Sequence, residues 1–296
     1  MCNRFTAPSV LFALFLMGSV ATVTAQGQDA NLVWNLKAGE ELTLELRQKT
    51  DTVTAVEKKL IRVSLEVDAD LLWRVLSVDE KGFDILQTVT GMTVKMQLPD
   101  KDGTLEYDSR VDENPRGSAR TISLALQPLL AAKVRMKMDR RGNVTDVSTE
   151  LDEEIGAKGQ SESLRELFTP DVMSEMLAQV FPVLPGQSQK NWSSSVQREL
   201  PLGKVNMKTD YALGAVENGL TAIDVKGQLK LVEQDKAQQR TLRLDSAEII
   251  GSLHFDQDAG RFRKGDVQQT VVAESREQNM LIRTKVTSRL RFVLHD

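Results

Sequence analysis

Apolar and polar residues alternate with a period of two over most of this chain. The longest run covers residues 282–294, where Ile282 and Phe292 lie on one side and Arg283 lies on the other. Successive side chains of a β-strand point to opposite faces of a sheet, so the alternation predicts antiparallel strands with one buried face and one wet face. Further runs of this kind occupy residues 42–46, 61–67, 92–98 and 223–231.

Turn sequences separate the alternating runs, and each of them contains Gly or Asn. Tight hairpins need residues with positive φ, which Gly and Asn adopt more readily than other residues. We therefore expect hairpins between consecutive strands. The turn sequences are residues 79–82, 100–103, 140–143, 217–219 and 257–260.

The middle of the chain has a different period. Residues 121–132 predict a short helix or helix–turn element interrupted at Pro128, and residues 161–168 predict a second helix. Thr169-Pro170 is typical of a helix start, with Thr as the N-cap and Pro at the first helical position. Apolar residues then recur at positions i, i+3, i+4 and i+7, which predicts an amphipathic helix over residues 170–181.

These patterns predict an α+β, mostly β fold, in which curved antiparallel sheets of half-barrel type surround a central helical segment. Residues 103–108 (Gly-Thr-Leu-Glu-Tyr-Asp) resemble residues 251–256 (Gly-Ser-Leu-His-Phe-Asp), and similarly spaced glycines precede both. The repetition indicates an internally duplicated half, although hairpins that reuse the same turn residues also produce such matches. We expect a signal peptide at 1–25, a first β-rich half at 26–150, a helical segment and linker at 151–185, and a second β-rich half at 186–296, the two halves forming one domain.

The first 25 residues have the pattern of a secretory signal peptide. Arg4 precedes the apolar run Val10–Met17, and small residues lead to a cleavage site between Ala25 and Gln26. No other apolar run approaches the ~20 residues of a membrane-spanning helix. We therefore expect a soluble periplasmic or extracellular protein. Its mature part has no disulfides, because Cys2 is the only cysteine.

Charge and residue types argue against most partners and enzyme mechanisms. The formal net charge of −4 does not favour nucleic acid as a partner. His254 and His295 are the only histidines, so the sequence predicts no metal site, no cofactor and no catalytic residues, and the protein is not expected to be an enzyme. We expect His254 to be a solvated strand residue. The Asp-rich turns at 100–103 and 256–260 are typical of hairpins, with weak calcium binding as the alternative.

Methionine is concentrated on the apolar faces of the predicted elements. Flexible, polarizable methionine side chains fill irregular cores, and they also line adaptable apolar binding surfaces. If the protein binds an apolar ligand, these residues are the candidate contacts: Met92, Met96, Met136, Met138, Met173 and Met176.

Four short motifs resemble those of a known family. They are Trp34-x-Leu-Lys-x-Gly39-Glu40, Leu184-Pro185-Gly186 followed by Trp192, Phe255-Asp256, and Gly260-Arg261. In these motifs the chain resembles a family of exported, β-rich bacterial proteins that is known only as a domain of unknown function. The resemblance covers nearly all of the mature chain and implies no catalytic residues. More distantly, the expected architecture is similar to that of periplasmic lipoprotein carriers, which are half-barrels with an apolar cavity.

Two functions are compatible with these observations. The first is a non-catalytic exported protein that binds a hydrophobic or lipid-like ligand in a β half-barrel. The alternative is a structural or protein-interaction component of the bacterial cell envelope that holds no small ligand and uses an apolar patch or an open sheet edge.

Overall fold

The computed structural model describes residues 32–99, 103–150, 180–186, 189–200, 203–233, 241–277 and 280–296. The predicted signal peptide with its cleavage site at Ala25 and Gln26 lies outside the described residues. The helix predicted over residues 161–168 also lies outside them. Of the helix predicted over residues 170–181, only residues 180 and 181 are described.

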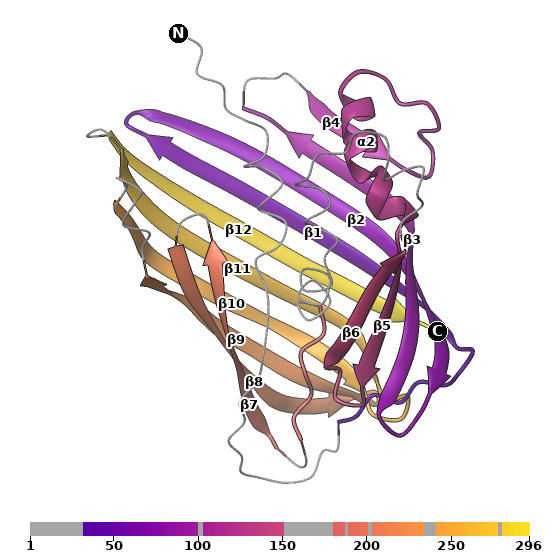
Figure 1. Cartoon of the computed structure of the whole chain (residues 1–296). Coiled ribbons are helices and arrows are strands. Elements are labelled where there is room, and N and C mark those ends of the chain that lie inside the picture. The colour runs from indigo at the N-terminus through magenta and orange to yellow at the C-terminus, as the bar shows by residue number, and fades with distance from the viewer. Residues whose placement is uncertain are drawn as a thin grey trace.

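A single large antiparallel sheet dominates the described residues, which confirms the mostly β fold (Figure 1). The sheet has twelve strands in the order β6-β5-β3-β2-β1-β12-β11-β10-β9-β8-β7, which includes all of them except β4. β5 pairs with residues 82–88 of β3, and β4 pairs with residues 93–97 of the same strand. The strands are β1 (Glu41–Val56), β2 (Lys59–Val78), β3 (Gly82–Gln97), β4 (Thr104–Asp108), β5 (Lys133–Asp139), β6 (Val144–Glu150), β7 (Asn191–Leu200), β8 (Gly203–Glu217), β9 (Leu220–Glu233), β10 (Thr241–Asp256), β11 (Arg261–Glu277) and β12 (Met280–His295).

The first and last strands pair with each other in the middle of the sheet. β1 and β12 are in register from Thr43 opposite His295 to Val56 opposite Ile282. The two sequence halves therefore share one continuous sheet. Residues 104–108 form β4 and residues 251–256 end β10, so the proposed duplicates lie in strands of very different length. The duplication and the domain boundaries at 26–150, 151–185 and 186–296 stay predictions.

The hairpin turns form where the sequence predicts them. Asp79 caps the β2–β3 turn, because its carboxylate accepts hydrogen bonds from the backbone N–H groups of Lys81 and Gly82 at 2.7 and 2.9 Å. Asn218 and Gly219 have φ values of 51° and 78° in the β8–β9 turn. Of the turn predicted at 100–103, only Gly103 is described.

The helix α2 (Gly117–Ala131) differs from its prediction in two respects, because it begins four residues before Thr121 and Pro128 does not interrupt it. Proline leaves the carbonyl of the residue four positions earlier without a helical donor. That residue is Leu124, which is 54% exposed, so water can satisfy the carbonyl. The helix packs against β3 and β4 (Figure 1).

Glycines allow the sheet to curve. Gly251 on β10 has no room for a side chain, since a Cβ there would lie 2.4 Å from the carbonyl oxygen of Asp266 and 2.7 Å from Cα of Val267 on β11. Gly265 on β11 is equally crowded, with an added Cβ 2.3 Å from the ring of Phe292. Such close approaches are typical of sheets that bend over a core. The sheet therefore has a concave inner face and an outer face.

Two core clusters cover parts of the inner face. The larger one joins residues of the two edge strands, with Val147 from β6 and Trp192 from β7, which is possible only because the sheet is curved. The smaller one lies between α2 and strands β2 and β3 and contains Leu65, Ala69, Met92 and Val94.

Candidate functional site

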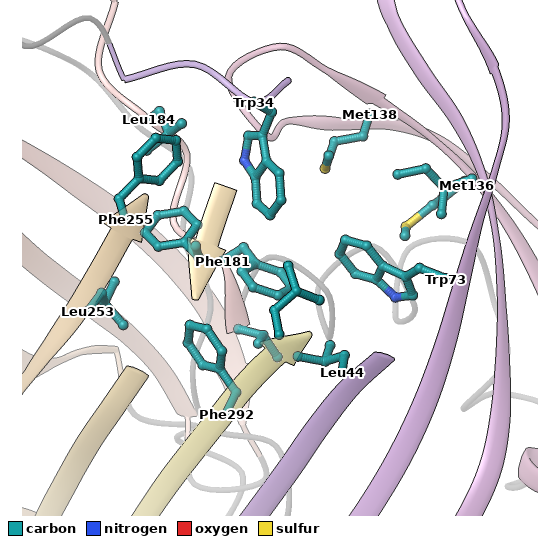
Figure 2. Close-up of a cluster of buried hydrophobic side chains, with 14 of the residues drawn as sticks. Trp34, Leu44, Trp73, Met136, Met138, Phe181, Leu184, Leu253, Phe255 and Phe292 are labelled. Atoms are coloured by element: carbon teal, nitrogen blue, oxygen red, sulfur yellow. The ribbon is translucent and has the colours of Figure 1, made fainter. Parts of the chain in front are cut away.

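The inner face of the sheet is the candidate functional site, and aromatic rings fill one end of it (Figure 2). Phe181, from the segment 180–186, lies at the centre. Its ring centroid is 5.3 Å from that of Trp34, 5.2 Å from that of Trp73 and 5.1 Å from that of Phe292. Edge-to-face packing at these distances is favourable beyond the burial of apolar area. This end of the inner face is therefore solid protein.

A row of buried polar side chains crosses the inner face next to the aromatic end. The strand registers place these residues opposite one another in the order Thr50, Ser288, Gln269, then Ile249 and Gly227, then Thr209 and Ser194. The polar members, which we call the polar row, are all buried: Thr50, Ser288, Gln269, Thr209 and Ser194.

Part of the polar row is satisfied by hydrogen bonds within the sheet. The Thr50 and Ser288 hydroxyls lie 3.1 Å apart, and the Gln48 side-chain amide donates to the Ser288 oxygen at 3.2 Å. Gln269 is different. Its side chain is 3% exposed, and neither its amide oxygen nor its amide nitrogen has a hydrogen-bond partner.

Beyond the polar row, the inner face continues with small apolar and hydroxyl side chains. Val63, Thr52, Val286 and Val271 lie opposite one another on β2, β1, β12 and β11. All four are half-buried, and none belongs to either core cluster or packs against one. We call these four residues the open row. It is an apolar stretch of the inner face that belongs to neither core cluster.

The predicted methionine contacts fall into two separate places. Met136 and Met138 are buried in the larger cluster near Trp34 and Trp73 (Figure 2).

Met92 is buried under α2, and Met96 packs against the same cluster, so these two lie in the smaller core. Met173 and Met176 lie outside the described residues. The structure thus does not bring the four described methionines together, and their role as ligand contacts stays a prediction.

A cleft of about 410 Å³ lies elsewhere, on strands β7 to β9. Its lining includes Lys208, Asp210, Asp224 and Lys226, and Lys208 and Asp210 form an ion pair at 2.9 Å. None of the four described methionines lines it. Four of its nine lining residues are charged, so this cleft does not suit a ligand that is apolar throughout.

A network of charged residues ties the C-terminal residue to the β10–β11 hairpin. Arg261 is buried and pairs with Glu40 at 2.8 Å and with Asp296 at 3.0 Å. Arg263 donates to Asp296 at 2.8 Å and to Asp256 at 3.0 Å. The hydrogen bond from Arg263 holds the pKa of the Asp296 carboxyl below its usual range. The network is structural, because each carboxylate is already paired with an arginine.

His254 is half-buried on β10 between Ala222 and Lys264, so it lies on a strand as predicted but is less solvated than expected. Its Nδ1 is buried without a partner, and burial followed by the nearby Lys264 charge lowers its pKa. Its register partners, Ala222 on β9 and Lys264 on β11, flank the imidazole on both sides.

The described residues offer no cluster of three or more metal-binding side chains. The Asp256 carboxylate, in one of the Asp-rich turns, accepts hydrogen bonds from the Ala259 backbone N–H at 2.9 Å and from Arg263. It therefore acts as a turn cap. Within the same part of the chain, no helix has both the length and the apolar character needed to cross a membrane.

Gln269 is the residue of the inner face that the sequence analysis missed. It lies two residues after Val267 and two residues before Val271 on β11, so the three side chains share one face of the strand. Gln269 therefore occupies a position where the alternation calls for an apolar residue. An amide at such a position is the signal that could have identified it, because buried polar groups need partners.

Comparison with known proteins gives one informative match. No curated protein matches the chain. A crystal structure of an outer membrane channel from Pseudomonas putida F1 aligns with 90% of this chain and 100% of its own, at 7% identity and a TM-score of 0.26, a value too low to support any argument. The similarity to periplasmic lipoprotein carriers stays a prediction.

A family model matches residues 80–260, more than half of the chain. The resemblance to a family of unknown function is thereby confirmed, and the chain belongs to the family of unknown function DUF6263.

Proposed function

We propose that this protein is an exported, non-catalytic binding protein that holds an apolar, lipid-like ligand against the inner face of its sheet. The observation that carries the proposal is the open row. Val63, Thr52, Val286 and Val271 form an apolar stretch on a concave face, and neither core cluster packs on them. Apolar concave surfaces of this kind are typical of sites for small apolar molecules.

The energetics set a minimum size for the ligand. Burying an alkyl chain contributes about 0.8 kcal/mol per methylene. Ten methylenes therefore supply about 8 kcal/mol, which corresponds to a dissociation constant of about 1 μM before the cost of ordering the chain. We propose a ligand with an alkyl chain of about this length or longer.

Export is part of the proposal. The sequence of residues 1–25 supports it, and the cleavage site between Ala25 and Gln26 would release a chain to the periplasm or the outside of the cell. Sequencing the N-terminus of the protein from an envelope fraction checks this step. A mature protein that starts with Met1 and stays in the cytoplasm would contradict it.

Native mass spectrometry of the exported protein tests the binding. We expect a co-purifying apolar mass that dissociates when the protein unfolds. The variant Val271→Lys places a charge on the inner face and should lose this mass. Val272→Lys, its neighbour on the outer face, is the matched control and should keep it. The proposal is wrong if protein from its native host carries no such mass, or if both variants keep it.

One observation favours the alternative, a protein-interaction component of the envelope. The β1–β2 hairpin and the start of β12 lie side by side at one end of the sheet, where Leu60 is 62% exposed and Leu281 is 47% exposed. Exposed apolar side chains at one place are typical of contact surfaces. Cross-linking in native envelopes from position 60 tests this function. Leu60→Ser should then remove a partner that Val111→Ser, at another exposed apolar residue, leaves in place.

A further inference from the structure

Gln269 lies in the middle of the polar row. Its side-chain oxygen and nitrogen are both buried, and neither has a hydrogen-bond partner. A buried amide without partners is unfavourable, because it has given up hydrogen bonds to water and gained none. Exchange of its oxygen and nitrogen positions would not change this, since neither atom has a partner. A group of this kind needs an explanation, and a hydrogen-bonding partner from outside the chain is one that fits its place on the inner face.

The register neighbours of Gln269 do not supply the missing partners. Ser288, its register partner on β12, already shares hydrogen bonds with Thr50 and Gln48. Ile249, its register partner on β10, has no polar side-chain atom. The amide therefore offers one acceptor and two N–H donors on the inner face.

The surroundings also determine the charge of a suitable partner. The register neighbours are Ile249 and Ser288, and the flanking positions on the same face of β11 are Val267 and Val271. None of these residues is charged. An ionised carboxylate or phosphate buried here would have no counter-charge, which is strongly unfavourable. An uncharged hydroxyl, ester or amide can bond to Gln269 without that cost.

We propose that Gln269 is the polar anchor of the apolar ligand site and selects ligands that carry an uncharged hydrogen-bonding group on an alkyl chain. This inference rests on the proposed function. Gln269 lies between the aromatic end and the open row, next to Val271 on the same face. The alkyl chain then lies along the open row while its polar group meets the amide.

Displacement of the fluorescent probe N-phenyl-1-naphthylamine from the mature, delipidated protein at pH 8 tests the inference. The competitors are dodecane, 1-dodecanol and dodecanoate, which share one chain length and differ in the polar group. The quantity of interest is the dissociation constant of dodecanol divided by that of dodecane. One neutral hydrogen bond changes this ratio by about tenfold.

We expect Gln269→Met to raise the dodecanol-to-dodecane ratio about tenfold, because methionine keeps the size of the side chain and removes its hydrogen bonds. Gln268→Met is the matched control, since Gln268 lies on the opposite face of the same strand and should leave the ratio unchanged. Gln269→Asn, which withdraws the amide by one methylene, should also raise the ratio and covers the case that the methionine variant misfolds.

The outcomes separate the two proposals. If the competitors displace the probe but the Gln269 variants leave the ratio unchanged, the inference is wrong and the proposed function stands. If dodecanoate binds more tightly than dodecanol, the neutral anchor is also wrong. If no competitor displaces the probe from the wild-type protein, the proposed function fails and the inference with it.

Discussion

At the scale of the residue, Gln269 illustrates how a binding group can oppose stability. Its amide is buried without a partner on a face where Val267 and Val271 are the strand neighbours. The folded protein without ligand therefore loses the hydrogen bonds that this amide makes with water in the unfolded chain. Binding sites often retain groups of this kind, and their replacement raises stability at the expense of function.

We predict that Gln269→Met raises the free energy of unfolding of the delipidated protein by about 1 kcal/mol, because it removes an unsatisfied buried amide. Urea denaturation, monitored by circular dichroism, measures this change. Gln268→Met on the outer face should stay within about 0.5 kcal/mol of the wild type. A destabilised Gln269→Met would mean that the amide has a partner in solution.

At the scale of the element, glycines on the inner face decide where strands can bend and approach. Gly251 and Gly265 lie on β10 and β11, and side chains at either position would overlap atoms of the neighbouring strand. A β-branched residue would be the better strand former at both positions by intrinsic preference. The close approach required by the curved sheet therefore outweighs propensity.

Gly251→Ala should lower the free energy of unfolding by about 3 kcal/mol, since the new Cβ meets backbone atoms that cannot move without separating β10 from β11. Thermal unfolding measures the effect. Gly186→Ala is the control, because a Cβ there would have its nearest neighbour at 3.9 Å on the flexible side chain of Arg141. Equal effects of the two substitutions would contradict the role of Gly251 in the close approach.

Strand pairing also makes the free energy of unfolding depend on pH. Arg135 on β5 donates to Asp84 on β3 at 2.9 Å, and this hydrogen bond holds the pKa of Asp84 below its usual range. A depressed pKa means that the unfolded state binds a proton at a higher pH than the folded state. The resulting stability is present above the unfolded value of about 3.9 and is lost as the pH falls toward the folded value.

We therefore predict that the free energy of unfolding falls between about pH 5 and pH 3, and that Arg135→Gln makes this fall shallower. Urea titrations at a series of pH values measure it. Arg47→Gln removes the same charge from a 67% exposed side chain and should leave the slope nearly unchanged. An unchanged slope in Arg135→Gln would show that other carboxylates carry the acid sensitivity.

At the scale of the whole molecule, the pairing of β1 with β12 joins the two ends of the chain. The strands that begin and end the sequence are neighbours over residues 43–56 and 282–295. Either half alone would leave a long central strand with an unpaired edge, which is prone to aggregate. We expect the halves to fold only together.

Expressing residues 26–150 and 186–296 separately tests this expectation. Neither half should give a monomer with cooperative unfolding, because each lacks the strand that covers its central edge. Size-exclusion chromatography and thermal unfolding measure it. A cooperative monomer from either half would show that this half is an independent domain.

The sequence alone determined the strands, their faces and most of their turns. Leu42, Leu44 and Phe292 are buried as the alternation requires, because side-chain direction in a strand depends only on position. Gly142, Asn218, Gly219 and Gly260 in the turns have positive φ for an equally local reason.

Only the tertiary structure decided which strands are neighbours and which inner-face positions remain outside the core. Alternation gives each strand its faces but not its partners, so the pairing of β1 with β12 could not be read from it. The unpartnered state of Gln269 depends on Ser288 and Ile249, which come from two other strands. Hydrogen-bond satisfaction is a property of neighbours in space, and the local sequence does not contain it.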